Sequence, residues 1–456
     1  MLVKCLSWDV RDVDGKFAVH GFGNNEKGES VYLQVRGYQP YFYVLVDDFD
    51  ERECRLLKRL NPAIDFAASV VEEKVNFYGF TNGEKRRFLK LVFNTKAAFW
   101  ATKKVLKGGQ VTFRGQAGYP FALFETRLNP ILRFFHDTDI TTTDTITVTQ
   151  YAIPRVKTTK CAHEIVCYTP KCLVRAAPCG PIPFRQATID IETYSWDRRF
   201  PDPEHPKNVI THVAIVLKRT TEAEPYAKLV VSNGLWTTPS TKPDICHRIV
   251  SSEKALLEQL FTWISTHDPD IIYTYNGDIF DWRYIWVRAV RCRVDIHTIS
   301  RHPNIRCHYE TDQKFESAAY GKNNYSRVTI PGRINLDILI YIRREFSTLP
   351  SFSLNNVATH FLDDTKDPVS VLEMFSAYDT KNPELSCTVA EYCVQDTILP
   401  QALVDKLNIL MSLDAMAGIT CVMIPDLLTR GQSAKTLSQL NRKTMAEGYL
   451  IPDGPA

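Results

Sequence analysis

Long apolar stretches are missing from this sequence of 456 residues, and so is the pattern of an export signal. No apolar run approaches the roughly 18 residues that would span a bilayer. The start, Met1 to Gly15, has no cationic segment followed by an apolar one, as a secretory signal would require. The hydrophobic share of 44% and the charged share of 23% indicate a globular chain with two or three domains. We therefore expect an intracellular protein without a membrane partner.

A disulfide framework, typical of small secreted domains, is also not expected, because a chain this long does not need cross-links to build a core. The 12 cysteines are scattered, which favours reduced thiols in a reducing compartment. In the one cluster, Cys161 to Cys179, only Cys167 and Cys172 have a gap that zinc ligands tolerate, and no second such pair follows. Ordinary strand and loop cysteines are the simpler interpretation, and structural zinc is the alternative.

Neither sign of charge dominates, since the net charge is +3. This balance neither requires nor excludes a polyanionic partner. There is no internal repeat and no low-complexity tract, so the organisation has to be inferred from local patterns.

Residues 1 to about 150 contain short alternating stretches, such as Val31 to Val35 and Tyr41 to Val46, separated by turn residues. Two helical stretches, 50–61 and 95–106, interrupt them, so we predict a mixed, mainly antiparallel domain. The proline-rich stretch 177–183 marks a boundary.

Beyond this boundary, strands alternate with helices, which is typical of an α/β sheet domain. The patterns predict strands at 187–192, 212–217, 229–233 and 270–275, and helices at 252–266 and 280–291. From about residue 398 to 448 the chain is predicted to be mostly helical.

The first chemical candidate is the pair Asp190 and Glu192, at the end of the first of these strands. Side chains two residues apart on a strand point to the same face, so the two carboxylates converge. A divalent cation would remove the repulsion between them. The alternative is coincidence, because about half a dozen acid-x-acid pairs are expected by chance in such a chain.

The second candidate, Asp281, opens the helix that follows Tyr275 and Asn276. Taken alone, it reads as an ordinary acid near a helix N-terminus, where a carboxylate is favourable.

The third candidate is the pair Tyr392 and Asp396, which lie four residues apart in a helical stretch and share one face. Taken alone, it reads as a surface helix with a half-buried tyrosine. Together the three candidates could bring four carboxylates to one end of a sheet, where they would hold two Mg²⁺ or Mn²⁺ ions. Such a site suits in-line hydrolysis of a phosphodiester.

In this order, the three segments resemble the exonuclease motifs of family B DNA polymerases, of the delta-like or large-DNA-virus type. The similarity continues outside the acids, in Phe200–Pro203, Asp268–Ile272, Ile330–Asp337, Ser351–Ala358, Leu427–Gln432 and Ser438–Leu440. The resemblance covers most of residues 30 to 452 and is most specific from residue 184 onward.

The resemblance implies a mixed-sheet, ribonuclease-H-like 3′–5′ exonuclease domain at 184–409. It also implies a mainly β, mixed α/β N-terminal domain at 1–183 and a helical segment at 410–456 that returns to it. The overall class is α/β, or α+β for the whole chain.

The resemblance also assigns roles to single residues. Asp190, Glu192 and Asp396 would bind one Mg²⁺ ion, while Asp190 and Asp281 would hold a second, and Mn²⁺ could substitute. Tyr392 would orient the attacking water, and Asn276 and Phe280 would contact the unpaired 3′ end. Arg430, Gln432 and Lys435 lie in a matched segment and are candidates for contact with the DNA backbone.

The partners implied are the primer 3′ end, single-stranded DNA, and a sliding clamp or other processivity factor. A nuclear or viral replication site is implied if the source is eukaryotic or viral. The palm, fingers and thumb of the family have no counterpart here, since we find neither a Ser-Leu-Tyr-Pro-Ser segment nor an Asp-Thr-Asp segment in a palm setting. We therefore expect proofreading hydrolysis and no DNA synthesis by this chain alone. The alternative is a DNA-binding assembly module of a split polymerase with a silent exonuclease.

The remaining patches have simpler interpretations. The basic runs Lys85–Arg87 and Arg343–Arg344 are typical of solvated faces, with phosphate contact as the alternative. Trp236, Trp263 and Trp282 are expected in the core or at the rim of the site.

Overall fold

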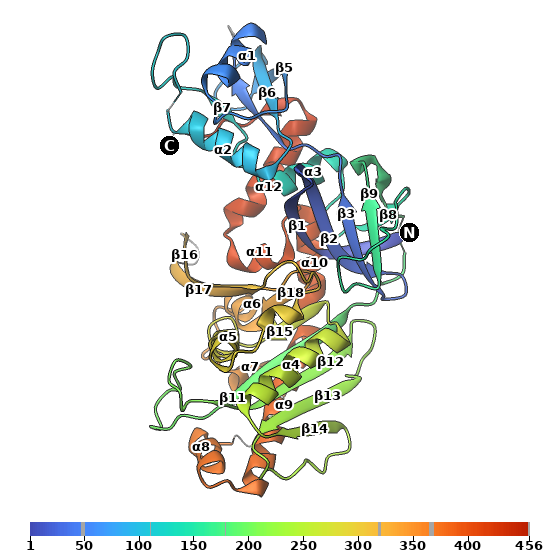
Figure 1. Ribbon diagram of the computed structural model, residues 1–456, viewed down its shortest axis with the longest axis vertical. Helices are drawn as coiled ribbons and strands as arrows, with labels where there is room; N and C mark the ends of the chain where they lie inside the picture. The colour runs from blue at the N-terminus through green and yellow to red at the C-terminus, as the bar shows by residue number, and fades with distance from the viewer. Residues whose placement is uncertain (47–50, 110, 178, 318–320, 364–368, 455–456) are drawn as a thin grey trace.

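The computed structural model describes residues 1–46, 51–109, 111–177, 179–317, 321–363 and 369–454. Three sheets and a separate hairpin are arranged along the long axis of the molecule (Figure 1). Within the described residues, no helix is long and apolar enough to cross a membrane. The 11 described cysteines are all free thiols.

A six-stranded sheet in the order β10-β8-β1-β2-β3-β9 contains most of the N-terminal strands. Its pairings are antiparallel except for β3 with β9, so the predicted mainly antiparallel character is confirmed. Its strands are β1 (Leu2–Val13), β2 (Lys16–Asn25), β3 (Ser30–Val35), β8 (Thr145–Val148), β9 (His163–Cys167) and β10 (Leu173–Arg175).

A second, five-stranded sheet lies at one end of the molecule, in the order β19-β5-β6-β4-β7 (Figure 1). One of its edge strands, β19, comes from near the end of the given sequence and pairs in parallel with β5. The strands are β4 (Tyr41–Leu45), β5 (Ala68–Asn76), β6 (Lys85–Val92), β7 (Leu123–Phe124) and β19 (Tyr449–Leu450). The helices of the N-terminal half are α1 (Glu51–Leu60), α2 (Lys96–Lys107), α3 (Pro130–Thr138) and the single turn η1 (Pro170–Cys172).

The third sheet has the order β14-β13-β12-β11-β15-β18 and mixes antiparallel with parallel pairings. The four strands predicted here from residue 187 to 275 are β11, β12, β13 and β15, and all four are confirmed. The strands are β11 (Arg185–Thr193), β12 (Ile210–Arg219), β13 (Ala227–Asn233), β14 (Ile245–Val250), β15 (Ile271–Thr274) and β18 (Ile334–Asp337), with the hairpin β16 (His308–Ser317) and β17 (Gly321–Thr329) outside the sheet.

Helices cover both faces of this third sheet. One face packs its aliphatic side chains against α4 and α5, while α9 packs against Ala214, Val216 and Val230 on the other face. Figure 1 shows α4 and α9 on opposite sides of the strands. The helices in the second half of the chain, including those that lie away from this sheet, are α4 (Glu253–His267), α5 (Asp281–Cys292), η2 (Ile296–Ile299), α6 (Ile338–Glu345), α7 (Leu354–Leu362), α8 (Val371–Asp379), α9 (Pro383–Lys406), α10 (Ile409–Thr420), α11 (Ile424–Thr429) and α12 (Gln432–Ala446).

A buried ionic network joins the first and third sheets. Arg301 donates to Asp268 (2.8 Å) and to Asp270 (2.6 Å), and Arg333 donates to Asp268 (2.8 Å). Asp270 also accepts from the side chain of Asn24 in β2 (2.8 Å) and from the backbone amide of Arg185 in β11 (2.7 Å). The first and third sheets are therefore joined at the buried carboxylate of Asp270, through its bond from Asn24.

Replacing Arg301 by methionine should destabilise the protein strongly, because Asp268 and Asp270 would lose their principal cation inside the protein. We expect a loss of about 3–5 kcal/mol in the free energy of unfolding, the range for breaking a buried ion pair. Urea denaturation measures it. The matched control is Arg199→Met, because Arg199 is exposed and its partner Asp197 is 3.8 Å away. Equal effects of the two substitutions would contradict the role given to the network.

Candidate active site

β11 presents two acidic side chains on the face of the sheet that α9 covers. Its alternate residues Ala187, Ile189 and Ile191 are buried in the core on the α4 and α5 side. Asp190 and Glu192 therefore point to the opposite face, as strand alternation requires. β11 lies between β12 and β15, but its pairing with β15 ends at Thr188, so Asp190 and Glu192 are held by the pairing with β12.

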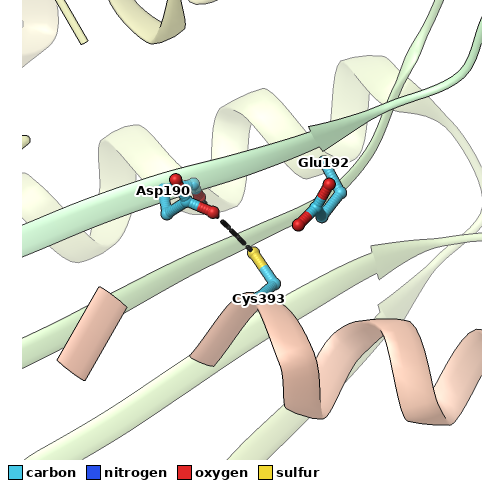
Figure 2. Close-up of side chains that lie close together, drawn as sticks. All are labelled: Asp190, Glu192 and Cys393. Carbon is cyan, nitrogen blue, oxygen red and sulfur yellow. Dashed lines mark hydrogen bonds between the residues drawn. The ribbon is translucent and has the colours of Figure 1, made fainter. Parts of the chain in front are cut away.

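α9 brings a thiol to this acid pair. The Cys393 thiol lies 3.8 Å from Asp190 Oδ2 and 3.6 Å from the Asp190 backbone oxygen (Figure 2). One ligand atom from each of Asp190, Glu192 and Cys393 lies within 4.8 Å of the others. Burial, and then the charges of Asp190 and Glu192, keep the pKa of Cys393 well above its ordinary value. The thiol is therefore protonated and acts as a weak donor.

Tyr392 precedes this thiol on α9 and belongs to the same acidic environment. Burial raises its pKa to about 12, with Glu192 and Asp190 adding to the shift. Its phenol is therefore protonated at neutral pH and can donate a hydrogen bond beside the acid pair. Asp396 follows one turn later on α9 and is half-buried.

Asp281 approaches β11 from the start of α5, beyond the point where the pairing of β11 with β15 ends. It is the first residue of α5, is only 2% exposed, and accepts a hydrogen bond from the backbone amide of Ile191 (3.2 Å). Burial, followed by repulsion from Asp190, raises its pKa well above the ordinary range. The carboxylate that could have been a simple helix-terminal acid is thus tied to β11, next to the acid pair.

The predicted acids differ in how closely they gather. In the part of the chain that the structure describes, the group of ligand atoms within 4.8 Å contains Asp190 and Glu192 but neither Asp281 nor Asp396. Asp281 is close enough to Asp190 for their charges to interact. Asp396 is placed by its position on α9, one turn from Tyr392.

Two further buried acids, which the sequence reasoning did not single out, shape the turn before Asp281. Asp337 accepts from the backbone amides of Asn276 (2.8 Å) and Asp278 (3.2 Å), and burial raises its pKa to about 6. Asp278 accepts from the side chain of Asn335 (2.8 Å). Gly277 is required in this turn, since a Cβ there would lie 2.3 Å from that of Thr274. The Asn-Gly-Asp sequence was the available signal.

The predicted contacts for a 3′ end lie at this turn as well. Asn276 has a left-handed backbone conformation (φ 65°), and the hydrogen bond from its backbone amide to Asp337 stabilises this conformation. Phe280 is half-buried, and its ring centroid lies 5.6 Å from that of Phe200, which is 81% exposed. A half-buried and an exposed aromatic ring therefore lie next to Asp281.

Arg430, Gln432 and Lys435 occupy a different region, where α11 ends and α12 begins. Arg430 and Gln432 are exposed, and Lys435 is partly buried. Arg430 lines a groove of about 430 Å³ that Asn129, Ser433 and others complete. The structure thus separates these residues from the acid pair.

The remaining patches have mostly structural roles. Arg344 donates to the backbone oxygens of Leu427 and Leu428, so it supports the end of α11. Trp263 and Trp282 are buried in the core, and Trp236 is half-buried against Tyr378, as expected. At Cys161 to Cys179, no group of three or more metal-binding side chains comes together among the described residues.

The sheet order and the acidic site define a class of protein, the nucleases with a ribonuclease-H-like fold. Buried carboxylates that repel one another fit a divalent cation, since oxygen ligands and negative charge are what such ions need. A family model described as "DNA polymerase family B, exonuclease domain" matches residues 121–357, which is more than half of the chain. The chain belongs to this family.

Relatives and a solved structure agree with this assignment. The DNA polymerase delta catalytic subunits of Oryza sativa subsp. japonica and Dictyostelium discoideum are 30% and 27% identical to it, each over 95% of this chain. The chain spans 40% and 41% of their lengths. The structure of the family B DNA polymerase from the archaeon Pyrobaculum calidifontis matches all of this chain and 52% of its own, with a TM-score of 0.74 at 19% identity, which supports the fold.

Removing the charge of Asp281 should stabilise the metal-free protein. Because its pKa is raised in the folded state, the parent loses stability as the pH rises through that pKa, whereas Asp281→Asn does not. In EDTA, the melting temperature of the variant should exceed that of the parent by a few degrees at pH 8, and by less at pH 5.

Mn²⁺ should reverse this order, since a bound cation stabilises the folded parent more than the variant. The control is Glu224→Gln, at an exposed acid in the turn after β12. If Asp281→Asn melts at the same temperature as the parent at both pH values, with and without Mn²⁺, this account is contradicted.

Proposed function

We propose that this chain is a 3′–5′ exonuclease that removes nucleotides from single-stranded or frayed DNA ends, as the proofreading part of a replicative polymerase. The observation that carries the proposal is the acid pair on β11 with Asp281 and Tyr392 beside it, in a chain of family B. On this proposal, residues 184–409 form the exonuclease unit, 1–183 the N-terminal domain and 410–456 the returning helical segment.

The proposed cofactor is a pair of Mg²⁺ ions. Asp190, Glu192 and Asp396 would hold one ion, and Asp190 with Asp281 would hold the other, with Mn²⁺ as a substitute. When bound, such ions supply a nucleophilic hydroxide and stabilise the charge of the leaving oxygen. The raised pKa of Asp281 supports this assignment, because an adjacent cation would let the carboxylate ionise.

The protein's own side chains would position the substrate. Tyr392, protonated at neutral pH, would donate a hydrogen bond that orients the attacking water. Phe280 and Phe200 would stack on unpaired terminal bases, which every base permits through its π-face. A mismatched end is easier to unstack, so it would reach this site more often than a paired end.

The wider setting follows from the relatives. Their being DNA polymerase delta catalytic subunits supports a role in DNA replication, with the polymerase domains in the same protein or in a separate chain. A sliding clamp or other processivity factor, and a nuclear or viral replication site, belong to the same proposal. Arg430, Gln432 and Lys435 would contact the DNA backbone outside the exonuclease site.

Changing the acid pair should abolish hydrolysis. We expect Asp190→Ala with Glu192→Ala to lower the release of mononucleotides from a 3′-labelled single strand by at least about a thousandfold, because oriented charge stabilisation is lost. The measurement is gel electrophoresis of the digest with Mg²⁺.

The matched control is Glu222→Ala with Glu224→Ala, another acid-x-acid pair. It lies in the turn after β12, and the register of β11 with β12 puts that turn at the opposite end of the strands. A double variant at Asp190 and Glu192 that digests DNA like the parent would overturn the proposal. DNA binding without metal-dependent cleavage by the parent would favour a binding module.

Tyr392→Phe should lower kcat by roughly 10- to 100-fold with little change in KM, since the ring stays and only the hydroxyl is lost. Steady-state kinetics on a single-stranded oligonucleotide measures this split. Tyr226→Phe, at a tyrosine just before β13, is the control and should behave as the parent. A KM effect without a kcat effect would show that the phenol binds substrate rather than orients water.

A further inference from the structure

The segment that follows the acid pair carries two exposed aromatic side chains, and one of them contacts Phe280 beside Asp281. We name residues 194–209, between β11 and β12, the rim loop. Phe200 of this loop is highly exposed and contacts Phe280 edge to face (5.6 Å). Trp196 stacks on His205 at 5.2 Å between ring centroids, and Lys207 lies over the Trp196 ring.

The first end of the rim loop is tied to α8. Tyr194 donates its hydroxyl to Asp379, and Arg198 donates to the same carboxylate (3.4 Å). The ring of Tyr194 also packs on Tyr378, with 4.8 Å between centroids. These contacts are partly exposed, so they fix only the beginning of the loop.

The far end of the loop is held by one buried guanidinium. Arg288 is 4% exposed, and its Nη1 donates to the backbone oxygens of His205 (3.0 Å) and Pro203 (3.3 Å). Its Nη2 donates to the backbone oxygen of Pro206 (3.5 Å). Three backbone oxygens of the loop thus accept hydrogen bonds from a single side chain. Only the planar, forked guanidinium of arginine offers donors in this arrangement.

Glu253 completes this anchor. Arg288 Nε donates to Glu253 Oε1 (2.8 Å), and Arg288 Nη2 donates to Oε2 (2.6 Å). Glu253 Oε1 also accepts from the backbone amide of Ile210, where the loop ends and β12 begins (2.8 Å). The charge of the guanidinium is therefore compensated, and the carboxylate fixes the end of the loop from the other side.

The anchor belongs to the same helix as the buried acid. Asp281, Tyr284 and Arg288 follow each other on α5 at three- and four-residue spacing, so they share one helix face. Phe280 also contacts Tyr284, at 5.7 Å between centroids. Any shift of Arg288 relative to the rim loop would therefore move Phe200 relative to Phe280 and Asp281.

We propose that Arg288 is a positioning residue that holds the rim loop so that Phe200 stays against Phe280 beside the carboxylate site, and that it thereby determines the affinity for a single-stranded 3′ end. The proposal rests on the proposed exonuclease function. Arg288 touches no reacting atom, because its donors are used by the loop and by Glu253. Its contribution should therefore show in substrate binding rather than in the chemical step.

The test uses the full chain and the double variant Arg288→Met with Glu253→Gln. This pair removes both buried charges together, which avoids leaving one unpaired, and glutamine can still accept from the Ile210 amide. A second variant, Arg288→Lys, keeps the charge but cannot reproduce the fork.

The matched control is Arg133→Met with Glu125→Gln. This pair is equally buried and is joined at 2.5 Å, but it lies in the N-terminal half, away from the rim loop. Any general effect of losing a buried ion pair should appear in the control as well.

Binding is measured by fluorescence anisotropy in EDTA, with a linear single-stranded oligonucleotide and with a circular one that has no 3′ end. We expect both Arg288 variants to bind the linear strand about tenfold more weakly, because misplaced positioning groups have effects of this size or larger. Binding of the circular strand, and both affinities of the control, should stay as in the parent.

Hydrogen exchange of residues 194–209 should also be faster in the Arg288 variants, and with Mg²⁺ their KM should rise while kcat stays within about twofold. Unchanged affinity for the linear strand, or an equal loss in the control, would overturn the proposal. Because binding and exchange are measured without metal, an inactive parent would contradict the proposed nuclease function and not this role of Arg288.

Discussion

The crowding of carboxylates at the end of β11 is the constraint on which the site depends. Asp281 is almost fully buried, and the charge of Asp190 lies close enough to raise its pKa further. Inside a protein such like charges repel strongly, so the folded chain tolerates them by holding protons. A divalent cation would replace those protons. The arrangement is thus expensive for an empty protein and favourable for one that binds metal.

The groups around these acids are kept neutral first by burial and then by the same repulsion. Tyr392 and Cys393 both have raised pKa values, because burial disfavours either anion and the nearby carboxylates add repulsion. The two side chains therefore remain donors over the pH range in which the carboxylates can accept. Helix α9 delivers both to β11, and the long packed contact of this helix with the sheet keeps them there. Electrostatics and packing thus select the same protonation states.

Much of this could be predicted from sequence because the signals are local. Alternation placed Asp190 and Glu192 on one face of a strand, and four-residue spacing placed Tyr392 and Asp396 on one side of a helix. Cys393, Asp337 and the pair of Arg288 and Glu253 could not be found this way. Their partners are distant in the chain, so only the packing of α5 and α9 on the sheet and the pairing of β18 within it show what they contact. Asp281 resembled an ordinary helix-terminal acid for the same reason.

The pairing of β19 with β5 links the two ends of the chain, as β5 spans Ala68–Asn76 and β19 spans Tyr449–Leu450. During synthesis, the outer edge of β5 has to wait for more than 350 residues before its neighbour is made, and an unpaired strand edge invites wrong partners. Contacts so distant in sequence also form slowly. The five-stranded sheet is therefore a part of this protein that can be completed only after all the chain between β5 and β19 has been made.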